Sequence, residues 1–220
     1  MQRRKNLSRS SKPPLSNRRS AKVNTSGNRK PSGAIRIISG QWRGRKLSVL
    51  DAEGLRPTTD RTKETLFNWL MQDIVDRHCL DAFSGSGGLG IEALSRGASA
   101  VTFVELNKYA AQNITSNLSL LQVSEDKASV IQSDTLQFLQ SINNDAVQYD
   151  LVFLDPPFNK GFMQPCINLL QQRNLLATDA LVYLEMEAGL SELEVPQSWS
   201  LLKEKATQQM HYQLWIVNQE

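Results

Sequence analysis

Across the central part of the chain, short apolar runs alternate with amphipathic segments whose apolar residues recur at helical spacing. The short runs predict strands and the amphipathic segments predict helices. We expect strands at 79–83, 100–105, 129–132, 149–155 and 181–186, and helices at 88–96, 108–121, 135–140 and 162–171. Strands separated by helices predict a parallel sheet covered on both faces, because neighbouring parallel strands need a crossover connection.

Two pairs of predicted strands have no helix between them. The runs at 201–206 and 212–217 predict an antiparallel hairpin at one end of the sheet, and those at 34–38 and 46–50 predict a second hairpin near the start. A helix capped by Thr59 or Asp60 then leads into the sheet. The predicted fold class is α/β and Rossmann-like: a mostly parallel seven-stranded sheet with a C-terminal antiparallel hairpin and an N-terminal β-hairpin extension.

Charge is distributed unevenly along the 220 residues. Residues 1–50 hold 14 of the 25 Lys and Arg residues and no acid, so residues 51–220 hold 11 basic and 22 acidic residues. A cationic arm on an acidic body favours a polyanion such as nucleic acid. We predict a disordered basic tail at 1–32, because aliphatic residues are few there. A solvated leader, an RNA-attracting arm and a transit peptide remain alternatives for this tail.

The rest of the composition excludes several classes of protein. No apolar run approaches the roughly 20 residues of a membrane span, and no apolar segment follows the basic start as in a secretory signal. Two Cys and two His, none in a metal-ligand spacing, argue against a disulfide scaffold, a metal site and His-based nucleophilic catalysis. We expect a cytoplasmic protein with a hairpin extension at 33–58 and one main domain at 59–220.

A basic turn lies between the two strands of the first predicted hairpin. Arg43, Arg45 and Lys46 follow Trp42, a combination that can contact phosphate and stack on a base. The same charges can instead protect an exposed strand edge from pairing with another chain. We therefore treat these three cations as candidate RNA-binding residues, with the charged edge as an equal alternative.

A glycine-rich loop joins the first central strand to its helix. Glycines at this position let backbone N–H groups approach a ligand, and an acid at the end of the next strand can accept hydrogen bonds from ribose hydroxyls. Taken alone, the pattern fits either a nicotinamide dinucleotide or S-adenosylmethionine. The candidate cofactor residues are Asp81, Phe83, Gly85, Gly87, Gly90 and Glu105. Asp134, after the third strand, either accepts from an adenine amino group or caps the following helix.

Asp155, Pro156, Pro157 and Phe158 follow the fourth central strand. The prolines stiffen the turn that carries the carboxylate, and they leave nearby carbonyls free to accept hydrogen bonds. Such a turn suits a planar exocyclic amine, whose two N–H groups would donate to Asp155 and to the Pro156 carbonyl while Phe158 stacks on the ring. A base inside a duplex cannot reach this turn, so the target must be unpaired or flipped.

These motifs, DAFSGSG at 81–87 and DPPF at 155–158, resemble the class I S-adenosylmethionine-dependent amino-methyltransferases. More narrowly, IRIISGQWRGRKL at 35–47, LRPTTDR at 55–61 and ETLFNWL at 64–70 resemble the bacterial RsmD family over about residues 33–217. The resemblance implies methylation of guanine N2 at position 966 of 16S rRNA, on an assembled or partly assembled small subunit. We further expect a monomer that needs no metal.

The resemblance also implies roles for individual residues. Gly85, Gly87, Glu105 and Asp134 match cofactor positions, and 155–158 match the catalytic turn. The segment Arg56, Pro57 and Thr58 would lie near the methionine end of the cofactor or the substrate entrance, unless it is an ordinary linker and helix cap. Adenine N6 of RNA or DNA as target, a nicotinamide-dependent oxidoreductase and a non-catalytic RNA-binding module remain alternative functions.

Overall fold

The computed structural model describes residues 31–50, 60–142, 148–189 and 193–218. Residues 1–30 of the predicted tail and the segment containing Arg56, Pro57 and Thr58 lie outside these residues. The prediction of a tail to residue 32 was wrong at its end, because Pro31 and Ser32 already belong to the first strand. The elements are β1 (Pro31–Arg36), β2 (Lys46–Leu50), α1 (Asp60–Trp69), β3 (His78–Asp81), α2 (Gly88–Ser95), β4 (Ala100–Glu105), α3 (Lys108–Leu120), β5 (Ala128–Gln132), α4 (Thr135–Ser141), β6 (Tyr149–Leu154), α5 (Met163–Gln172), β7 (Leu176–Glu187), β8 (Trp199–Ala206) and β9 (Met210–Val217).

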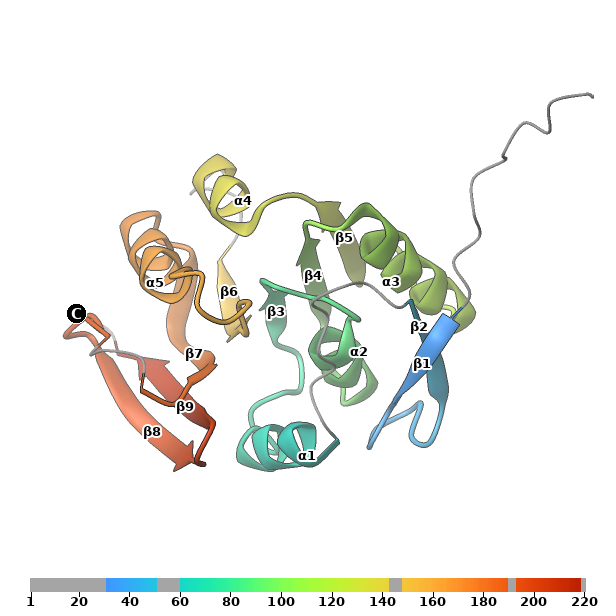
Figure 1. Ribbon diagram of the computed structural model, residues 1–220, viewed down its shortest axis with the longest axis horizontal. Helices are drawn as coiled ribbons and strands as arrows, with labels where there is room; N and C mark the ends of the chain where they lie inside the picture. The colour runs from blue at the N-terminus through green and yellow to red at the C-terminus, as the bar shows by residue number, and fades with distance from the viewer. Residues whose placement is uncertain (1–30, 51–59, 143–147, 190–192, 219–220) are drawn as a thin grey trace, which may run out of the picture.

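The main sheet has seven strands in the order β5-β4-β3-β6-β7-β9-β8. The first five pair in parallel, and β9 is antiparallel to both β7 and β8. The predicted mostly parallel sheet with a closing hairpin is therefore confirmed. The last strand of the chain lies inside the sheet, which leaves β8 at the edge (Figure 1).

Helices cover both faces of this sheet, as the alternating pattern predicts (Figure 1). On one face, α1, α2, α3 and the β1-β2 hairpin pack against residues such as Cys79, Phe103 and Phe153. On the other face, α4 and α5 pack against the alternate positions of the same strands, among them Leu80 and Leu154. Each central strand is thus buried on both sides, which explains its continuous apolar sequence.

The N-terminal hairpin is docked on the main domain and contributes to its core. Ile35, Ile37, Leu47 and Val49 are buried in the same cluster as the residues of α1 and α2. The buried carboxylate of Glu92 in α2 accepts hydrogen bonds from the amides of residues 38 and 39, at 2.8 and 3.0 Å. These amides are therefore not available to a partner strand, and β1 ends at residue 36, two residues earlier than predicted.

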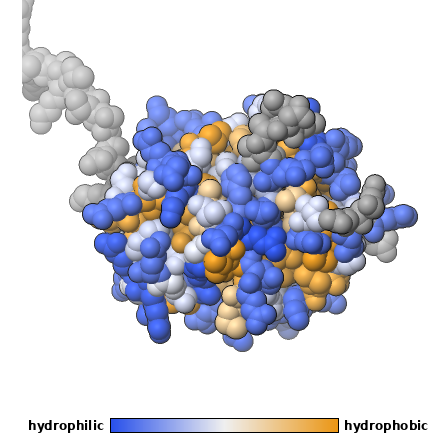
Figure 2. Space-filling model, turned by 180° about the vertical axis from the view of Figure 1, so that it is seen from behind, coloured by the Kyte–Doolittle hydropathy of each residue, from blue (hydrophilic) through white to orange (hydrophobic). Residues whose placement is uncertain are grey.

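The face seen in Figure 2 is largely hydrophilic, with small separate hydrophobic patches. Cys79 and Cys166 are both buried as free thiols. Within the residues that the structure describes, no helix is long and apolar enough to cross a membrane.

Candidate active site

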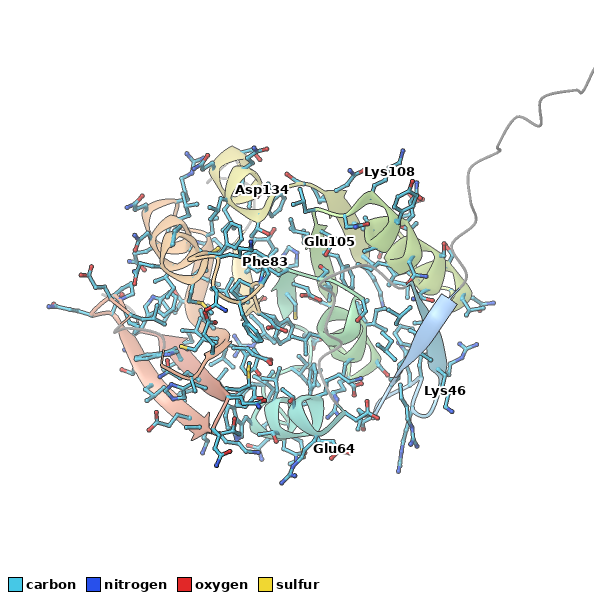
Figure 3. The ribbon with its side chains drawn as sticks, viewed as in Figure 1. Lys46, Glu64, Phe83, Glu105, Lys108 and Asp134 are labelled. Carbon is cyan, nitrogen blue, oxygen red and sulfur yellow. The ribbon has the colours of Figure 1, made fainter. Side chains whose placement is uncertain are left out.

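The topology brings the carboxyl ends of β3, β4, β5 and β6 to one edge of the sheet, and the predicted acidic residues follow these ends. Figure 3 shows Phe83, Glu105 and Asp134 gathered at this edge. In open α/β sheets, ligands bind at the carboxyl ends of the strands, where the order of the strands reverses. That reversal lies between β3 and β6 here, so the glycine loop and the Asp155 turn flank the expected crevice.

The glycine loop needs residues that tolerate a left-handed backbone. Gly85 and Gly87 have φ of 52° and 77°. The Gly87 amide donates to the Ser84 carbonyl at 2.6 Å, and the Ser84 amide donates to the Val104 carbonyl at 3.0 Å. A Cβ on Gly87 would lie 3.1 Å from the Ile91 side chain, so the loop packs closely on the first turn of α2. This geometry turns the chain sharply between β3 and α2.

Glu105 lies at the end of β4 and supports this loop directly. Its carboxylate accepts from the Gly85 amide at 2.8 Å and from the Asn107 amide at 2.6 Å. Burial raises the pKa of Glu105, while the two amide donors oppose that shift. A carboxylate has about four acceptor positions, so Glu105 can hold the loop and still accept from the hydroxyls of a ribose.

The structure gives Asp81 and Gly90 packing roles within the motif. Asp81 is buried, and its carboxylate accepts from the Gly90 amide at 3.0 Å. Burial raises the pKa of Asp81 to about 7, the Gly90 amide opposes the shift, and Asp155 and Glu105 add to it. A Cβ on Gly90 would lie 2.3 Å from the Phe103 ring, so this glycine lets α2 approach β4. Asp81 and Gly90 therefore determine the shape of the loop from its buried side.

Asp134 fills one of the two roles that its sequence position allows. Its side chain caps α4 by accepting from the Gln137 amide at 3.1 Å, so the helix-cap interpretation is confirmed. The side chain is half-buried at the same edge of the sheet as Glu105 (Figure 3). Because a carboxylate has about four acceptor positions, Asp134 can cap the helix and still accept a hydrogen bond from a ligand. Phe83 is half-buried and packs against the Phe162 ring, with 5.8 Å between the ring centroids.

Strand β6 ends at Leu154, one residue earlier than predicted, and Asp155 follows directly after it. Pro156 is buried, Pro157 is exposed and Phe158 is half-buried. The strand ends here because neither proline has an N–H to donate to a neighbouring strand. Beyond the turn, the Asn159 amide donates to the Glu187 carboxylate at 2.9 Å, which ties the turn to the end of β7.

The structure does not bring the basic turn of the hairpin to this edge. Arg43, Arg45 and Lys46 are exposed, and Figure 3 places Lys46 away from Phe83 and Asp134. Trp42 is half-buried and packs against the core, and its amide donates to the Ser95 hydroxyl at 3.1 Å. The packing of Trp42 therefore fixes the position of the turn, whose three cations are exposed at a distance from the glycine loop.

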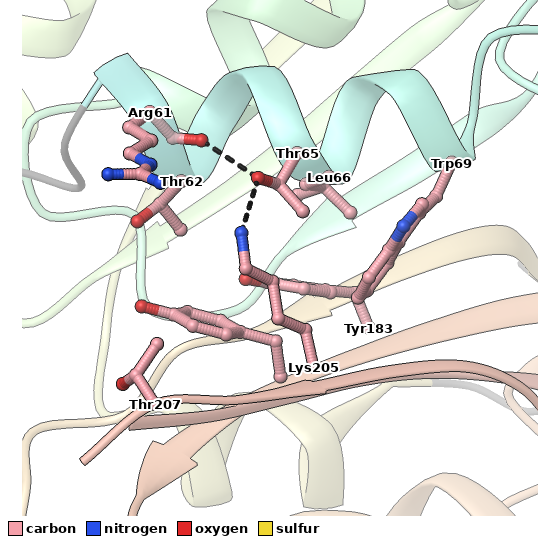
Figure 4. Close-up of a pocket in the computed structure, with 9 residues that line it drawn as sticks. Arg61, Thr62, Thr65, Leu66, Trp69, Tyr183, Lys205 and Thr207 are labelled. Carbon is pink, nitrogen blue, oxygen red and sulfur yellow. Dashed lines mark hydrogen bonds between the residues drawn. The ribbon is translucent and has the colours of Figure 1, made fainter. Parts of the chain in front are cut away.

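Sequence reasoning missed a cavity of about 290 Å³ between α1 and the β7-β9-β8 end of the sheet (Figure 4). Two cations, Arg61 and Lys205, and two tyrosines, Tyr183 and Tyr212, line it together with residues of α1. These residues come from three distant segments of the chain. No local spacing pattern links them, so only the tertiary structure could reveal this group.

Comparisons with known proteins agree with this architecture. A model of the family described as Conserved hypothetical protein 95 matches residues 35–216. The chain is 51% identical over 183 residues to ribosomal RNA small subunit methyltransferase D of Haemophilus influenzae, covering 83% of this chain and 94% of the relative. It is 47% identical over 188 residues to the protein of the same name from Escherichia coli K12, covering 86% and 92%.

Solved structures that resemble this chain are also of putative methyltransferases. A putative methyltransferase from Escherichia coli superposes with a TM-score of 0.78 at 45% identity, covering 84% of this chain and 99% of that one. A putative methylase from Haemophilus influenzae gives 0.74 at 45% identity, covering 85% and 100%. The matches extend over nearly the whole length of these structures. The family model, which matches residues 35–216, spans the glycine loop, the Asp155 turn and the closing hairpin.

Proposed function

The chain belongs to the family of ribosomal RNA small subunit methyltransferase D, and from this membership we propose that it transfers a methyl group from S-adenosylmethionine to the exocyclic N2 of one guanine in 16S rRNA. The observation that carries the proposal is the placement of the Asp155 turn on β6, next to β3 and its glycine loop. A cofactor held by the loop and an amine held by the turn would meet at this point.

The residues at the edge fit S-adenosylmethionine by their chemistry. The glycine loop offers a closely packed cradle, Glu105 suits the ribose hydroxyls, and Asp134 suits the adenine amino group. When bound, S-adenosylmethionine supplies a methyl group on a positively charged sulfur, which is a strong electrophile. The acids at the ends of β4 and β5 would hold its nucleoside, which leaves its methionine part over the glycine loop and beside Asp155.

The Asp155 turn orients and activates the amine. The Asp155 carboxylate and the Pro156 carbonyl accept its two N–H groups, which draws the nitrogen toward sp³ geometry and points its lone pair at the methyl carbon. With S-adenosylmethionine bound, the nitrogen lone pair would form the N–C bond as the S–C bond breaks with its electron pair staying on sulfur, and the cationic amine would then lose its extra proton to water. Orientation and charge stabilisation each supply several kcal/mol of rate enhancement in such sites. Asp155 therefore does not need to be a strong base.

The RNA has to present the guanine outside a helix. Phe158 stacks on the flipped base, and the exposed Arg43, Arg45 and Lys46 hold phosphates farther along the RNA. The basic tail adds non-specific attraction to RNA. The partner is the small ribosomal subunit or an assembly intermediate, and we infer a cytoplasmic protein that acts as a monomer.

Asp155→Ala tests this proposal. Methyl transfer to small subunits from a strain lacking the gene should fall about 100-fold or more, as when a key polar contact to the reacting group is removed. Calorimetric affinity for S-adenosylmethionine should change little. Asp126→Ala, which removes an exposed carboxylate before the amino end of β5, opposite to the strand ends that carry the site, is the matched control and should retain full activity.

Mass analysis of the modified nucleoside identifies the target atom. N2-methylguanosine agrees with the proposal, and N6-methyladenosine would replace it with an adenine-specific activity. Undiminished methyl transfer by the Asp155→Ala variant would remove the catalytic role from this turn.

A further inference from the structure

The cavity beside α1 lies on the other side of the Asp155 turn from the glycine loop. In the strand order β4-β3-β6-β7-β9, the glycine loop follows β3, the Asp155 turn follows β6, and the cavity is lined from β7 and β9. A cofactor over the glycine loop therefore does not fill this cavity. Its volume of about 290 Å³ is near the lower limit of small-molecule sites, which is about 300 Å³.

The cavity faces the same side of the sheet as Asp155. Leu154 pairs with Leu184, so Asp155 and Glu185 follow at the same level of neighbouring strands. Phe153 and Tyr183 also pair, and side chains two positions apart in a strand point to the same face. Burial raises the pKa of Tyr183 well above its ordinary value, and the carboxylates of Glu185 and Asp155 add to the shift, in agreement with this proximity.

The lining of the cavity combines cations with aromatic rings. Lys205 extends from β8 toward α1, where its Nζ donates to the Thr65 hydroxyl at 3.2 Å, and that hydroxyl donates to the Arg61 carbonyl at 3.0 Å (Figure 4). Trp69 and Tyr212 are half-buried and present ring surface. None of the described residues that line the cavity is acidic. Glu185 is only 6% exposed and accepts from the Tyr183 hydroxyl at 3.0 Å.

This combination is the chemistry that recognises single-stranded nucleic acid. Cationic side chains bind the phosphates of the backbone, and aromatic rings stack on bases whatever their sequence. Resting on the proposed function, we propose that the cavity is an RNA subsite for an unpaired nucleotide adjoining the methylated guanine. Its phosphate lies between Arg61 and Lys205, and its base lies against Tyr212. The subsite fixes the RNA strand on the side of Asp155 opposite to the cofactor.

Three variants of the full chain test this subsite: Lys205→Gln, Tyr212→Leu and, as the control, Lys203→Gln. Lys203 lies on the same strand, is exposed and does not line the cavity, so its substitution makes the same change of charge outside the site. The probe is purified small ribosomal subunits from a strain lacking the gene. The measurements are RNA affinity as a function of salt, KM and kcat for methyl transfer, and the calorimetric affinity for S-adenosylmethionine.

Lys205→Gln should weaken subunit binding and reduce the slope of log affinity against log salt by about 0.7, the value for one phosphate contact on a single strand. Tyr212→Leu should weaken binding about tenfold through lost stacking, and Tyr212→Phe should restore it. KM for the subunit should rise while kcat and cofactor affinity stay near wild type. Lys203→Gln should reduce the salt slope by less than Lys205→Gln does.

Failure of this inference differs from failure of the proposed function. If the wild type methylates small subunits, and the folded Lys205 and Tyr212 variants bind subunits as the wild type does, the subsite is refuted. It is also refuted if these variants mainly lose affinity for S-adenosylmethionine, because the cavity would then belong to the cofactor. If the wild type transfers no methyl group to small subunits, the proposed function fails, whatever the variants do in binding.

Discussion

The docking of the hairpin on α2 predicts that two glycines in one turn respond differently to the same substitution. Gly40 and Gly44 have φ of 81° and 83°, so alanine at either position costs about 1 kcal/mol or more for the left-handed backbone. A Cβ on Gly44 would meet nothing within 4 Å. A Cβ on Gly40 would lie 1.7 Å from the carbonyl oxygen of Ser95, which is far inside contact distance.

The Ser95 carbonyl belongs to the backbone of α2 and cannot rotate away, so the turn itself has to move in the Gly40→Ala variant. This movement breaks the hydrogen bonds from the Gln41 amide to the Ser95 carbonyl, at 2.8 Å, and from the Trp42 amide to the Ser95 hydroxyl, at 3.1 Å. Each contributes about 1 kcal/mol net. We therefore expect Gly40→Ala to lower the free energy of unfolding by about 3 kcal/mol and Gly44→Ala by only about 1 kcal/mol.

Urea denaturation and thermal melting of the two variants measure this difference directly. For a domain of this size, 1 kcal/mol corresponds to about 2–4 °C in Tm, so the Gly40 variant should melt at least about 4 °C below the Gly44 variant. Because both substitutions add one methyl group at the same backbone conformation, conformational cost cancels in the comparison. Equal losses of stability would refute the close packing of the turn on α2.

Two further predictions concern the glycine loop. The pKa of Asp81 is about 7 in the folded protein, against an ordinary value of 3.8. The folded state therefore favours the protonated form, so the contribution of Asp81 to the free energy of unfolding is present in full below about pH 4 and is lost as the pH rises to about 7. Urea denaturation of the wild type across this range should show a loss of up to about 4 kcal/mol that Asp81→Asn lacks; parallel curves would contradict the assignment. Gly90→Ala should destabilise the protein by about 2 kcal/mol, because its Cβ would lie 2.3 Å from the buried Phe103 ring. In the control, Gly88→Ala, the nearest atom is 3.5 Å away, and Tm should stay the same or rise.

Most of the fold could be predicted because the central strands are buried on both faces and because the helices, apart from the fully buried α2, are amphipathic. The prediction for the β4 strand at 100–105 is confirmed residue by residue. The prediction was wrong at the start of β7, which begins at Leu176 and not at 181. Thr178 and Asp179 are exposed, Asp179 has φ of 57°, and the register of β6 with β7 shifts here, so the apolar pattern is interrupted.

The candidate site was predictable only where it follows strand ends. Parallel topology forces such positions to one edge, which is why Glu105, Asp134 and the turn at Asp155 could be grouped from spacing alone. Whether an acid in the motif faces the ligand or the protein depends on packing, and Asp81 supports Gly90 from a buried position. The assignment of these residues to cofactor and substrate stays a prediction.

Helix α2 connects the two regions that the proposed function requires to act together. Its first turn carries the glycine loop, and its second half holds the hairpin through Glu92 and Ser95. Eight helical residues span about 12 Å, and the helix is buried along its whole length. A short helix packed on all sides behaves as a rigid spacer, so the basic turn at 43–46 keeps a fixed distance from the cofactor loop. Phosphates held by the hairpin would therefore set the register of the RNA against the Asp155 turn. The close packing at Gly40 then matters for more than stability, because displacing the turn would shift bound RNA relative to the reacting amine.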